Sequence, residues 1–394
     1  EEQQQPPRVA IVGGGFGGVE LAASIQRRLG DDAHVTLMSR GKPPMAGTRA
    51  APLIDQALAQ LGVQVEVSSV QEIKVVDRGV GQPNAYIVKR TKSTDQPQEI
   101  INEEEEQWDA VFWTAGSRPA DPVPEACHGL RAVASSQRLA LDPTLRCMWN
   151  DDVSQQGTAG WKPPPPVWGL GDCAEVVDIV NRSSQQVANP KTAQVAMQQS
   201  EILANNILAH LQIPQQSSSP QQQRRRRSSL RNGRRRDGPS PRLVKTFVYQ
   251  DLGSMFTLGG PNGALVAPGG DSPLAQLFVP LLDTADQALG QADRVLTQLA
   301  QSSSNDKNGL LDPTVLGLSL GSHGLGMDSS AAPGTLAGTL TGAARRALYA
   351  ARMPTNQQRA ISLVSATIAG AVSLARESNE KRRKSSSSSS SSSE

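Results

Sequence analysis

The stretch RVAIVGGGFGGVELAASIQRRLGDDAHVTLMSR, residues 8–40, determines the fold expected for this chain. It opens with a short apolar run at 8–12, which predicts a buried strand, and continues through a glycine-rich turn at 13–18. Residues 19–29 place apolar side chains at helical spacing, and 34–38 form a second apolar run. This order predicts a β-turn-α-β unit with parallel strands.

The glycines of the turn follow the spacing GxGxxG, at Gly13, Gly15 and Gly18. Gly13 permits the tight strand-to-helix turn, Gly15 lets the backbone approach a pyrophosphate, and Gly18 lets the helix pack on the strand. The helix N-terminus also offers unpaired N–H groups to phosphates. The pattern predicts a dinucleotide site, and the alternative is a glycine-rich turn without a ligand.

Ser39 and Arg40 follow the second apolar run, where an acidic residue would accept hydrogen bonds from the ribose diol of NAD. A serine and an arginine instead suit a 2′-phosphate, because a guanidinium can bind it bidentately. They favour NADPH, or the use of both cofactors, unless Arg40 is merely exposed to solvent. Glu20, expected in the first helical turn, either complements the helix dipole or faces the nicotinamide end of the cofactor.

Further strand and helix patterns follow this unit, so its βαβαβ order predicts a parallel sheet with covering helices. Residues 94–106 are polar and acidic and are expected to form a loop, and 247–266 are expected to be ordered. The other expected elements are helix 51–61, strand 63–67, a strand pair within 73–91, strands 108–113 and 167–170, and helices 192–211, 272–299 and 335–352.

The net charge of +2 is unevenly distributed, because residues 220–245 carry ten of the 39 basic residues and one acidic residue. Such a block could bind nucleic acid or an anionic membrane. Without interleaved aromatic residues or a folded module, a disordered insertion over 215–241 is favoured and no nucleic-acid partner is expected. The three cysteines form no CxxC pair, so no metal site or disulfide framework is expected.

Several motifs together resemble those of the flavoproteins with two dinucleotide-binding domains. They are GGGFGGVELAA at 13–23, TAG at 114–116 and VWGLGDCAEV at 167–176. The segment TAQVAMQQ at 192–199 is similar to the AQxAxQ motif of type II NAD(P)H:quinone oxidoreductases. DLGSMFTLGG at 251–260 and ARRALYAARMPT at 344–355 resemble the same family, the latter its plant and algal plastid branch.

This resemblance implies an α/β fold with a Rossmann-like NAD(P)H domain, part of a split FAD domain and a helical carboxy-terminal region. The implied boundaries are 7–118 for the NAD(P)H domain, 119–266 for the carboxy-terminal half of the FAD domain, 267–376 for a membrane-associated region and 377–394 for a disordered tail. The implied cofactor-binding residues are Gly13, Gly15, Gly18, Glu20, Ser39, Arg40, Gly116, Gly171, Asp172 and Ala193.

The resemblance implies that Asp172 contacts the ribitol of FAD. The alternative is that Asp172 caps a helix. Gln194 and Gln198 lie four residues apart on one helical face. They are the implied catalytic residues, near the flavin and the quinone head group, and the alternative is two exposed glutamines on a polar helix.

The implied activity is hydride transfer from NAD(P)H to FAD and electron transfer to a membrane quinone, without proton pumping. One departure from the family pattern is large, since no earlier GxGxxG motif for the ADP part of FAD precedes Gly13. The chain is therefore expected to be incomplete and to hold FAD poorly. The alternatives are a non-catalytic NAD(P)H-binding fragment and a soluble flavoprotein reductase with another acceptor.

Residues 360–375 are apolar and uncharged but too short to span a bilayer. They predict either an interfacial helix on a membrane or a helix packed on the core. The resemblance implies a plastid, membrane-associated location, with the mitochondrial inner membrane as the alternative. The implied partners are a quinone, a peripheral membrane surface and a second copy of the chain in a homodimer.

Overall fold

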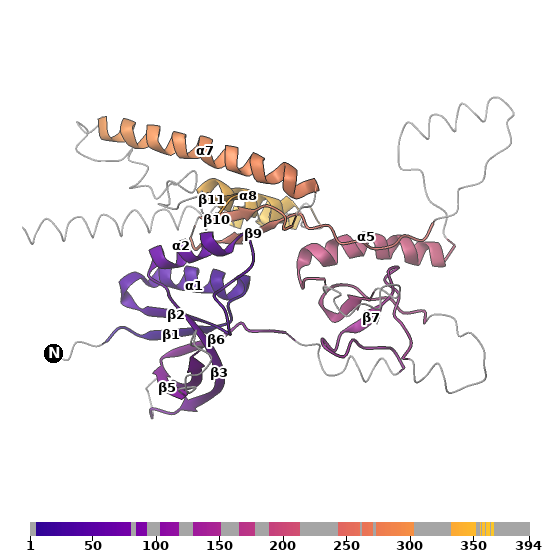
Figure 1. Cartoon of the computed structure of the whole chain (residues 1–394), viewed down its shortest axis with the longest axis horizontal. Coiled ribbons are helices and arrows are strands. Elements are labelled where there is room, and N and C mark those ends of the chain that lie inside the picture. Colours follow the sequence, from indigo (N-terminus) through magenta and orange to yellow (C-terminus); the bar gives the residue numbers. More distant parts are fainter. Residues whose placement is uncertain are drawn as a thin grey trace, which may run out of the picture. The chain divides into compact units, whose positions relative to one another are not determined.

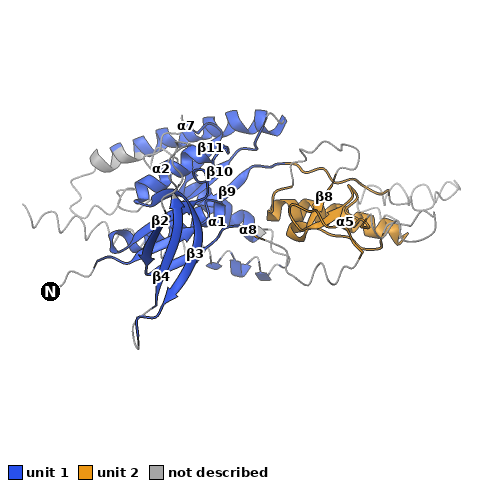
Figure 2. Cartoon of the chain, turned by 60° about the horizontal axis from the view of Figure 1, so that its bottom comes forward, with its two compact units in different colours: residues 1–116, 251–394 blue, residues 117–250 orange. Residues whose placement is uncertain are grey.

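The computed structural model describes residues 5–79, 84–92, 103–117, 129–150, 165–177, 189–212, 243–260, 262–270, 273–302 and 332–351, with a few more between 355 and 365. The chain forms two compact units, shown in Figure 2. Unit 1 contains residues 1–116 and 251–394, and unit 2 contains 117–250. The first boundary lies within two residues of the predicted one. The predicted boundary at 266 differs from this division, in which residues 251–266 belong to unit 1.

Unit 1 is built around a six-stranded sheet in the order β5-β4-β3-β2-β1-β6. Its strands are β1 (Arg8–Val12), β2 (His34–Ser39), β3 (Gln64–Val76), β4 (Ala85–Lys92), β5 (Glu103–Trp108) and β6 (Ala110–Trp113). Strand β1 pairs in parallel with β2 and β6, and β2 pairs in parallel with β3. The predicted Rossmann-like arrangement is confirmed, and the strand order reverses between β1 and β6.

Two helices, α1 (Phe16–Leu29) and α2 (Ala51–Leu61), cover one face of this sheet (Figure 1). Side chains of β1 alternate between the two faces. Val9 and Ile11 pack with the helices, whereas Val12 packs with Trp108 on the other face. Helix α2 has the predicted bounds, and α1 begins three residues earlier than predicted, directly after Gly15.

Strands β4 and β5 continue the sheet antiparallel from the long strand β3, and they also pack against the other face of the parallel strands, since Val88 of β4 and Trp108 of β5 cluster with Val12 of β1. The prediction of a loop over 94–106 is wrong for residues 103–106, which lie in β5, and residues 93–102 lie outside the described residues. Residues 103–106 form a strand because of Arg90 on β4, whose side chain is 1% exposed. It pairs with Glu66, with Glu104 at 3.4 Å and with Glu106 at 2.7 Å, so acidic residues are stabilised within the sheet.

Glu106 also makes the stability of this sheet depend on pH. Burial alone raises the pKa of Glu106, but the hydrogen bond from Arg8 and the charges of Arg90 and Arg8 outweigh it and hold that pKa below its usual value of 4.5. A depressed folded-state pKa stabilises the protein above the unfolded-state pKa, and this contribution is lost as the pH falls through the folded-state value.

We expect Glu106→Gln to lower the free energy of unfolding near neutral pH, because the glutamine lacks the paired charge. The difference from the unsubstituted chain should shrink as the pH falls below the usual carboxyl pKa of 4.5. Urea unfolding at neutral and acidic pH measures it. The exposed neighbour Glu105, replaced with glutamine, is the control and should show a much smaller effect at neutral pH. A Glu106→Gln difference that is the same at every pH would contradict this assignment.

A second, three-stranded sheet in unit 1 has the order β11-β10-β9. It consists of β9 (Ser254–Thr257), β10 (Gly263–Val266) and β11 (Thr335–Gly338), with helices α7 (Pro273–Ser302) and α8 (Thr339–Ala351). Phe256 and Val266 pack into the core formed with α1 and α2, which is why this segment belongs to unit 1.

The helix predicted over 335–352 is wrong for residues 335–338, because they pair antiparallel with β10 as strand β11. The predicted helix 272–299 corresponds to α7. Most of the apolar segment 360–375 lies outside the described residues. In the part of the chain that the structure describes, no helix is both long and apolar enough to cross a membrane.

The described residues of unit 2 include a small parallel sheet and a long helix. Its elements are β7 (Leu139–Leu141), the 3-10 turn η2 (Gly171–Cys173), β8 (Ala174–Val176) and α5 (Ala193–His210). The predicted helix 192–211 is confirmed within a residue at each end, with Thr192 as its N-cap. The predicted strand 167–170 is wrong, because only Trp168 forms an isolated bridge there and the strand follows the turn. The predicted insertion 215–241 lies outside the described residues.

Candidate dinucleotide site

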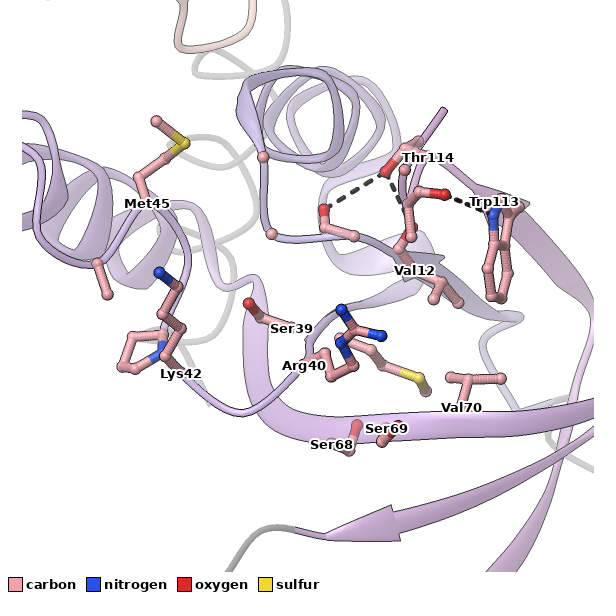
Figure 3. A pocket seen from close by; sticks show the side chains of 18 of the residues that line it. Val12, Ser39, Arg40, Lys42, Met45, Ser68, Ser69, Val70, Trp113 and Thr114 are labelled. Carbon is pink, nitrogen blue, oxygen red and sulfur yellow. Dashed lines mark hydrogen bonds between the residues drawn. The ribbon is translucent and has the colours of Figure 1, made fainter. Parts of the chain in front are cut away.

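A pocket of about 590 Å³ lies in unit 1 at the carboxyl ends of β1, β2 and β6 (Figure 3). Open α/β sheets bind ligands at this edge, next to the point where the strand order reverses. The volume is within the range of roughly 300–1,000 Å³ that small-molecule and cofactor sites occupy. Five of the predicted residues line this one pocket: Gly13, Gly15, Ser39, Arg40 and Gly116.

The glycine turn forms a close-packed cradle between β1, α1 and the segment after β6. Gly13 has φ +128°, and a Cβ there would lie 2.6 Å from Oγ1 of Thr114. A Cβ on Gly18 would overlap the carbonyl oxygen of Gly13. A Cβ on Gly15 would meet no atom within 4 Å, so the backbone there is open to a ligand. The local geometry therefore suits the predicted division of roles among the three glycines.

The segment after β6 is bonded to the turn. The Thr114 hydroxyl donates to the carbonyl oxygen of Val12 at 2.9 Å, and the Trp113 indole donates to the carbonyl oxygen of Ala115 at 2.8 Å. These bonds are drawn in Figure 3. The Thr114 bond holds this segment against β1, whereas the Trp113 bond is local to it, and Gly116 has φ +70° where the chain leaves the sheet.

Sequence reasoning missed several residues that line the pocket, among them Lys42, Ser68, Ser69 and Trp113. Lys42 follows Arg40 by two residues. Ser68 and Ser69 directly follow the strand predicted at 63–67, and the carboxyl ends of neighbouring parallel strands lie at one edge of a sheet. That rule could have identified the two serines, and also Trp113, which ends the strand predicted at 108–113.

Glu20 lies outside the residues that line the pocket. Since α1 begins at Phe16, Glu20 is not in the first helical turn as predicted. Its Oε1 accepts a hydrogen bond from the backbone N–H of Thr257 at 2.7 Å and pairs with Arg345 at 3.0 Å. The carboxylate therefore connects α1 to β9 and α8, and its contact with the nicotinamide stays a prediction.

In unit 2, the predicted flavin residues lie at the turn between β7 and β8. Gly171 has φ +71°, and its N–H donates to Oε1 of Gln199 at 2.7 Å. Gln199 is 1% exposed and was not singled out in the sequence, although it directly follows the AQxAxQ motif. Asp172 is exposed in this turn, and its contact with FAD stays a prediction.

Gln194 and Gln198 bind the segment that returns to α5 at residues 249–250. The Gln198 amide donates to the carbonyl oxygen of Gln250 at 2.8 Å and accepts from its N–H at 3.0 Å. The Tyr249 hydroxyl donates to Oε1 of Gln194 at 2.6 Å. The alternative of two exposed glutamines is therefore wrong, since both are half-buried and bonded. Their catalytic role stays a prediction, as does a cofactor contact at Ala193, which begins α5.

We expect Gln199→Leu to destabilise the Gly171 turn, because it leaves a backbone N–H without its buried partner. The expected loss is about 1–3 kcal/mol in the free energy of local opening. Hydrogen exchange at residues 169–173 measures it. Ser200→Ala, at the exposed neighbouring position, should leave the exchange unchanged. Unchanged protection at Gly171 in Gln199→Leu would show that the bond does not hold the turn.

The geometry defines the class: an α/β protein with a dinucleotide pocket at the switch point of a Rossmann-like sheet. Residues 1–200 match the family of pyridine nucleotide-disulphide oxidoreductases. This match covers about half of the 394 residues, and the chain belongs to this family.

Two curated proteins are similar to part of the chain. Demethylphylloquinone reductase NdbB of Synechocystis is 28% identical over 207 residues, which are 52% of this chain and 42% of that protein. The alternative NAD(P)H-ubiquinone oxidoreductase C1, chloroplastic/mitochondrial, of Arabidopsis thaliana is 26% identical over 265 residues, 66% of this chain and 40% of that protein. The chain thus spans less than half the length of these relatives.

Among solved structures, NDH2 of Plasmodium falciparum in complex with NADH is similar with a TM-score of 0.39 and 12% identity, over 70% of this chain and 61% of that one.

The family supports NAD(P)H and FAD as cofactors. The described residues fit a pyridine dinucleotide, because the cradle is closed where Gly13 and Gly18 pack and open at Gly15. The described residues offer fewer candidate contacts for FAD. The candidate is the exposed Asp172, in the turn whose Gly171 N–H is bonded to the buried Gln199. Within the described ranges, one strand–glycine turn–helix unit is present, and NAD(P)H would occupy it.

Proposed function

We propose that this chain is part of an NAD(P)H:quinone oxidoreductase, in which unit 1 binds NAD(P)H and unit 2 contributes to the flavin site. The observation that carries the proposal is the pocket at the switch point, where Gly13, Gly15, Ser39, Arg40 and Gly116 come together. The names of both relatives support a quinone as the electron acceptor.

The residues of unit 1 would bind and orient the dinucleotide. The backbone at Gly13 to Gly15 and the start of α1 would receive the pyrophosphate, because the first N–H groups of a helix attract anions. The β2 end with Ser39 and Arg40 would receive the adenosine ribose. Gly116 would leave room for the nicotinamide end, at the opposite side of the switch point.

In unit 2, Asp172 would accept hydrogen bonds from the ribitol of FAD, and Gln199 would hold its turn in place. FAD, when bound, supplies the electron transfer between NAD(P)H and the acceptor. Gln194 and Gln198 would lie near the quinone head group, where an amide can bond a carbonyl oxygen without adding charge. Electron transfer without proton pumping belongs to this proposal.

A membrane surface is the proposed source of the quinone. Exposed apolar side chains occur on both carboxy-terminal helices, with Leu277 and Leu281 on α7 and Leu340 and Leu348 on α8. Apolar residues on amphipathic helices can insert into the interface of a bilayer. The proposed location is the plastid, with the mitochondrial inner membrane as the second candidate. The name of the plant relative supports these two compartments. A homodimer is also part of the proposal.

The test uses the purified full chain with added FAD. Flavin absorbance that stays with the protein after gel filtration, bleaching on addition of NAD(P)H and return of the absorbance with a short-chain quinone are expected. A chain that binds NAD(P)H but retains no flavin would support the alternative, a nucleotide-binding fragment without activity. Flavin reduction that is reoxidised by soluble acceptors but not by quinones would support a soluble reductase instead.

A further inference from the structure

We propose that the pocket selects NADPH over NADH through an anion site for the 2′-phosphate, formed by Arg40, Lys42, Ser39 and Ser68. This inference rests on the proposed nucleotide site and names the form of the nucleotide that it takes. It adds Lys42 and Ser68 to the residues that the sequence pattern indicated.

The two cations of this site have no acidic partner in the described part of the chain. Arg40 and Lys42 are both exposed and line the pocket, and no carboxylate of the described residues pairs with either. In the same unit Arg8, Arg78 and Arg90 each pair with a carboxylate. Two unpaired cations two residues apart give the concave surface a positive potential that attracts an anion.

The two hydroxyls lie at the same edge of the sheet. Ser39 ends β2 opposite Val67 of β3, so Ser68 is the next residue along the neighbouring strand. Ser39 is 5% exposed, and a Cβ on Gly14 would overlap its Oγ, so the hydroxyl lies directly against the glycine turn. Figure 3 shows Ser39, Arg40 and Ser68 around the same hollow, with Lys42 further along the loop.

Ser68 provides the observation that points to a ligand. It is 2% exposed, and among the described residues its Oγ has no hydrogen-bond partner. Buried polar groups are nearly always bonded, and leaving one unbonded costs free energy. A phosphate oxygen of a bound nucleotide would accept this hydrogen bond.

The residues that line the pocket also include no aspartate or glutamate. NAD is recognised by a carboxylate that accepts hydrogen bonds from both ribose hydroxyls. Here that acceptor is missing from the lining, and the cations would instead bind a phosphate through charge-assisted hydrogen bonds. The chemistry of the lining therefore favours the phosphorylated ribose.

The test compares 2′,5′-ADP with 5′-ADP as probes for the full chain, by isothermal titration calorimetry. We expect 2′,5′-ADP to bind at least about tenfold more tightly at low salt. The preference should decrease as salt is added, because exposed charges are screened. The double variant Arg40→Gln/Lys42→Gln should remove the preference while 5′-ADP still binds, and Ser68→Ala should reduce it.

The double variant lowers the net charge by two, so its matched control is Arg28→Gln combined with Lys74→Gln, two exposed cations outside the pocket lining. This control should keep the preference. Equal affinity for both probes, or a preference that survives the double variant, would overturn the 2′-phosphate site and leave the proposed activity intact. Failure of both probes to bind would overturn the nucleotide site itself, and the proposed function with it.

Discussion

Replacement of Gly18 with valine is expected to abolish nucleotide binding and to lower the free energy of unfolding by about 3 kcal/mol. Gly18 is buried on α1, and any Cβ there would overlap the carbonyl oxygen of Gly13 and lie 2.9 Å from Oγ1 of Thr114. Neither group can move easily, because Gly13 is bonded to Met38 and Thr114 to Val12. The helix must therefore shift away from the strand, which opens the cradle.

Gly17 provides a control one residue away. A Cβ on Gly17 would meet no atom within 4 Å, and the residue is exposed in the same helix. Gly17→Ala should therefore leave binding unchanged and raise the free energy of unfolding by about 0.4–1 kcal/mol, since alanine loses less backbone entropy. Thermal unfolding and titration with NADPH measure both variants. A Gly18→Val protein that binds and unfolds like the unsubstituted chain would refute the role of the close approach.

The second large effect is expected for Arg90→Leu, with a loss of about 3–5 kcal/mol in the free energy of unfolding. The substitution removes a buried cation and leaves the carboxylates of Glu66, Glu104 and Glu106 close together without it. Breaking a buried ion pair from one side costs far more than breaking an exposed pair. The loss should become smaller as the pH falls far enough to protonate Glu106, whose folded-state pKa lies below its usual value of 4.5.

Lys74→Leu is the matched control for this prediction. Lys74 is 52% exposed and pairs with Glu72 on the surface of the same sheet, so its loss should cost less than about 1 kcal/mol. Urea unfolding monitored by tryptophan fluorescence compares the variants, since Trp108 is buried in this part of the core. Similar losses in Arg90→Leu and Lys74→Leu would show that burial of the cation contributes little.

The two variants test different parts of the same unit. Gly18→Val acts on the cradle and should affect binding and stability together. Arg90→Leu acts on the face of the sheet opposite α1 and α2, so at temperatures where the chain remains folded its nucleotide affinity should be close to that of the unsubstituted chain. This contrast separates loss of the site from loss of the fold.

Local patterns predicted the elements on which the pocket is built. The β-turn-α-β unit at 8–40 and the helices α2 and α5 all follow from the spacing of apolar residues and from turn chemistry. These signals lie within a few residues of one another, so they could be recognised without the tertiary structure.

Strands β5 and β11 could not be predicted in the same way. Four consecutive glutamates at 103–106 resemble a loop until Arg90, more than ten residues earlier, pairs with two of them. Residues 335–338 have a helical pattern in the sequence, but they form a strand because β10 offers an edge to pair with. In both cases a distant partner outweighs local propensity.

The sequence alone determined that this chain contains a Rossmann-like unit with a glycine turn, and motif resemblance indicated its family. The tertiary structure decided which side chains share a site. It placed Lys42 and Ser68 at the pocket with Ser39 and Arg40, directed Glu20 to β9 and α8, and bonded Gln194 and Gln198 to residues 249–250. The reason is physical: glycine conformation and helical spacing are local properties, whereas bonds between polar side chains depend on segments that only folding brings together.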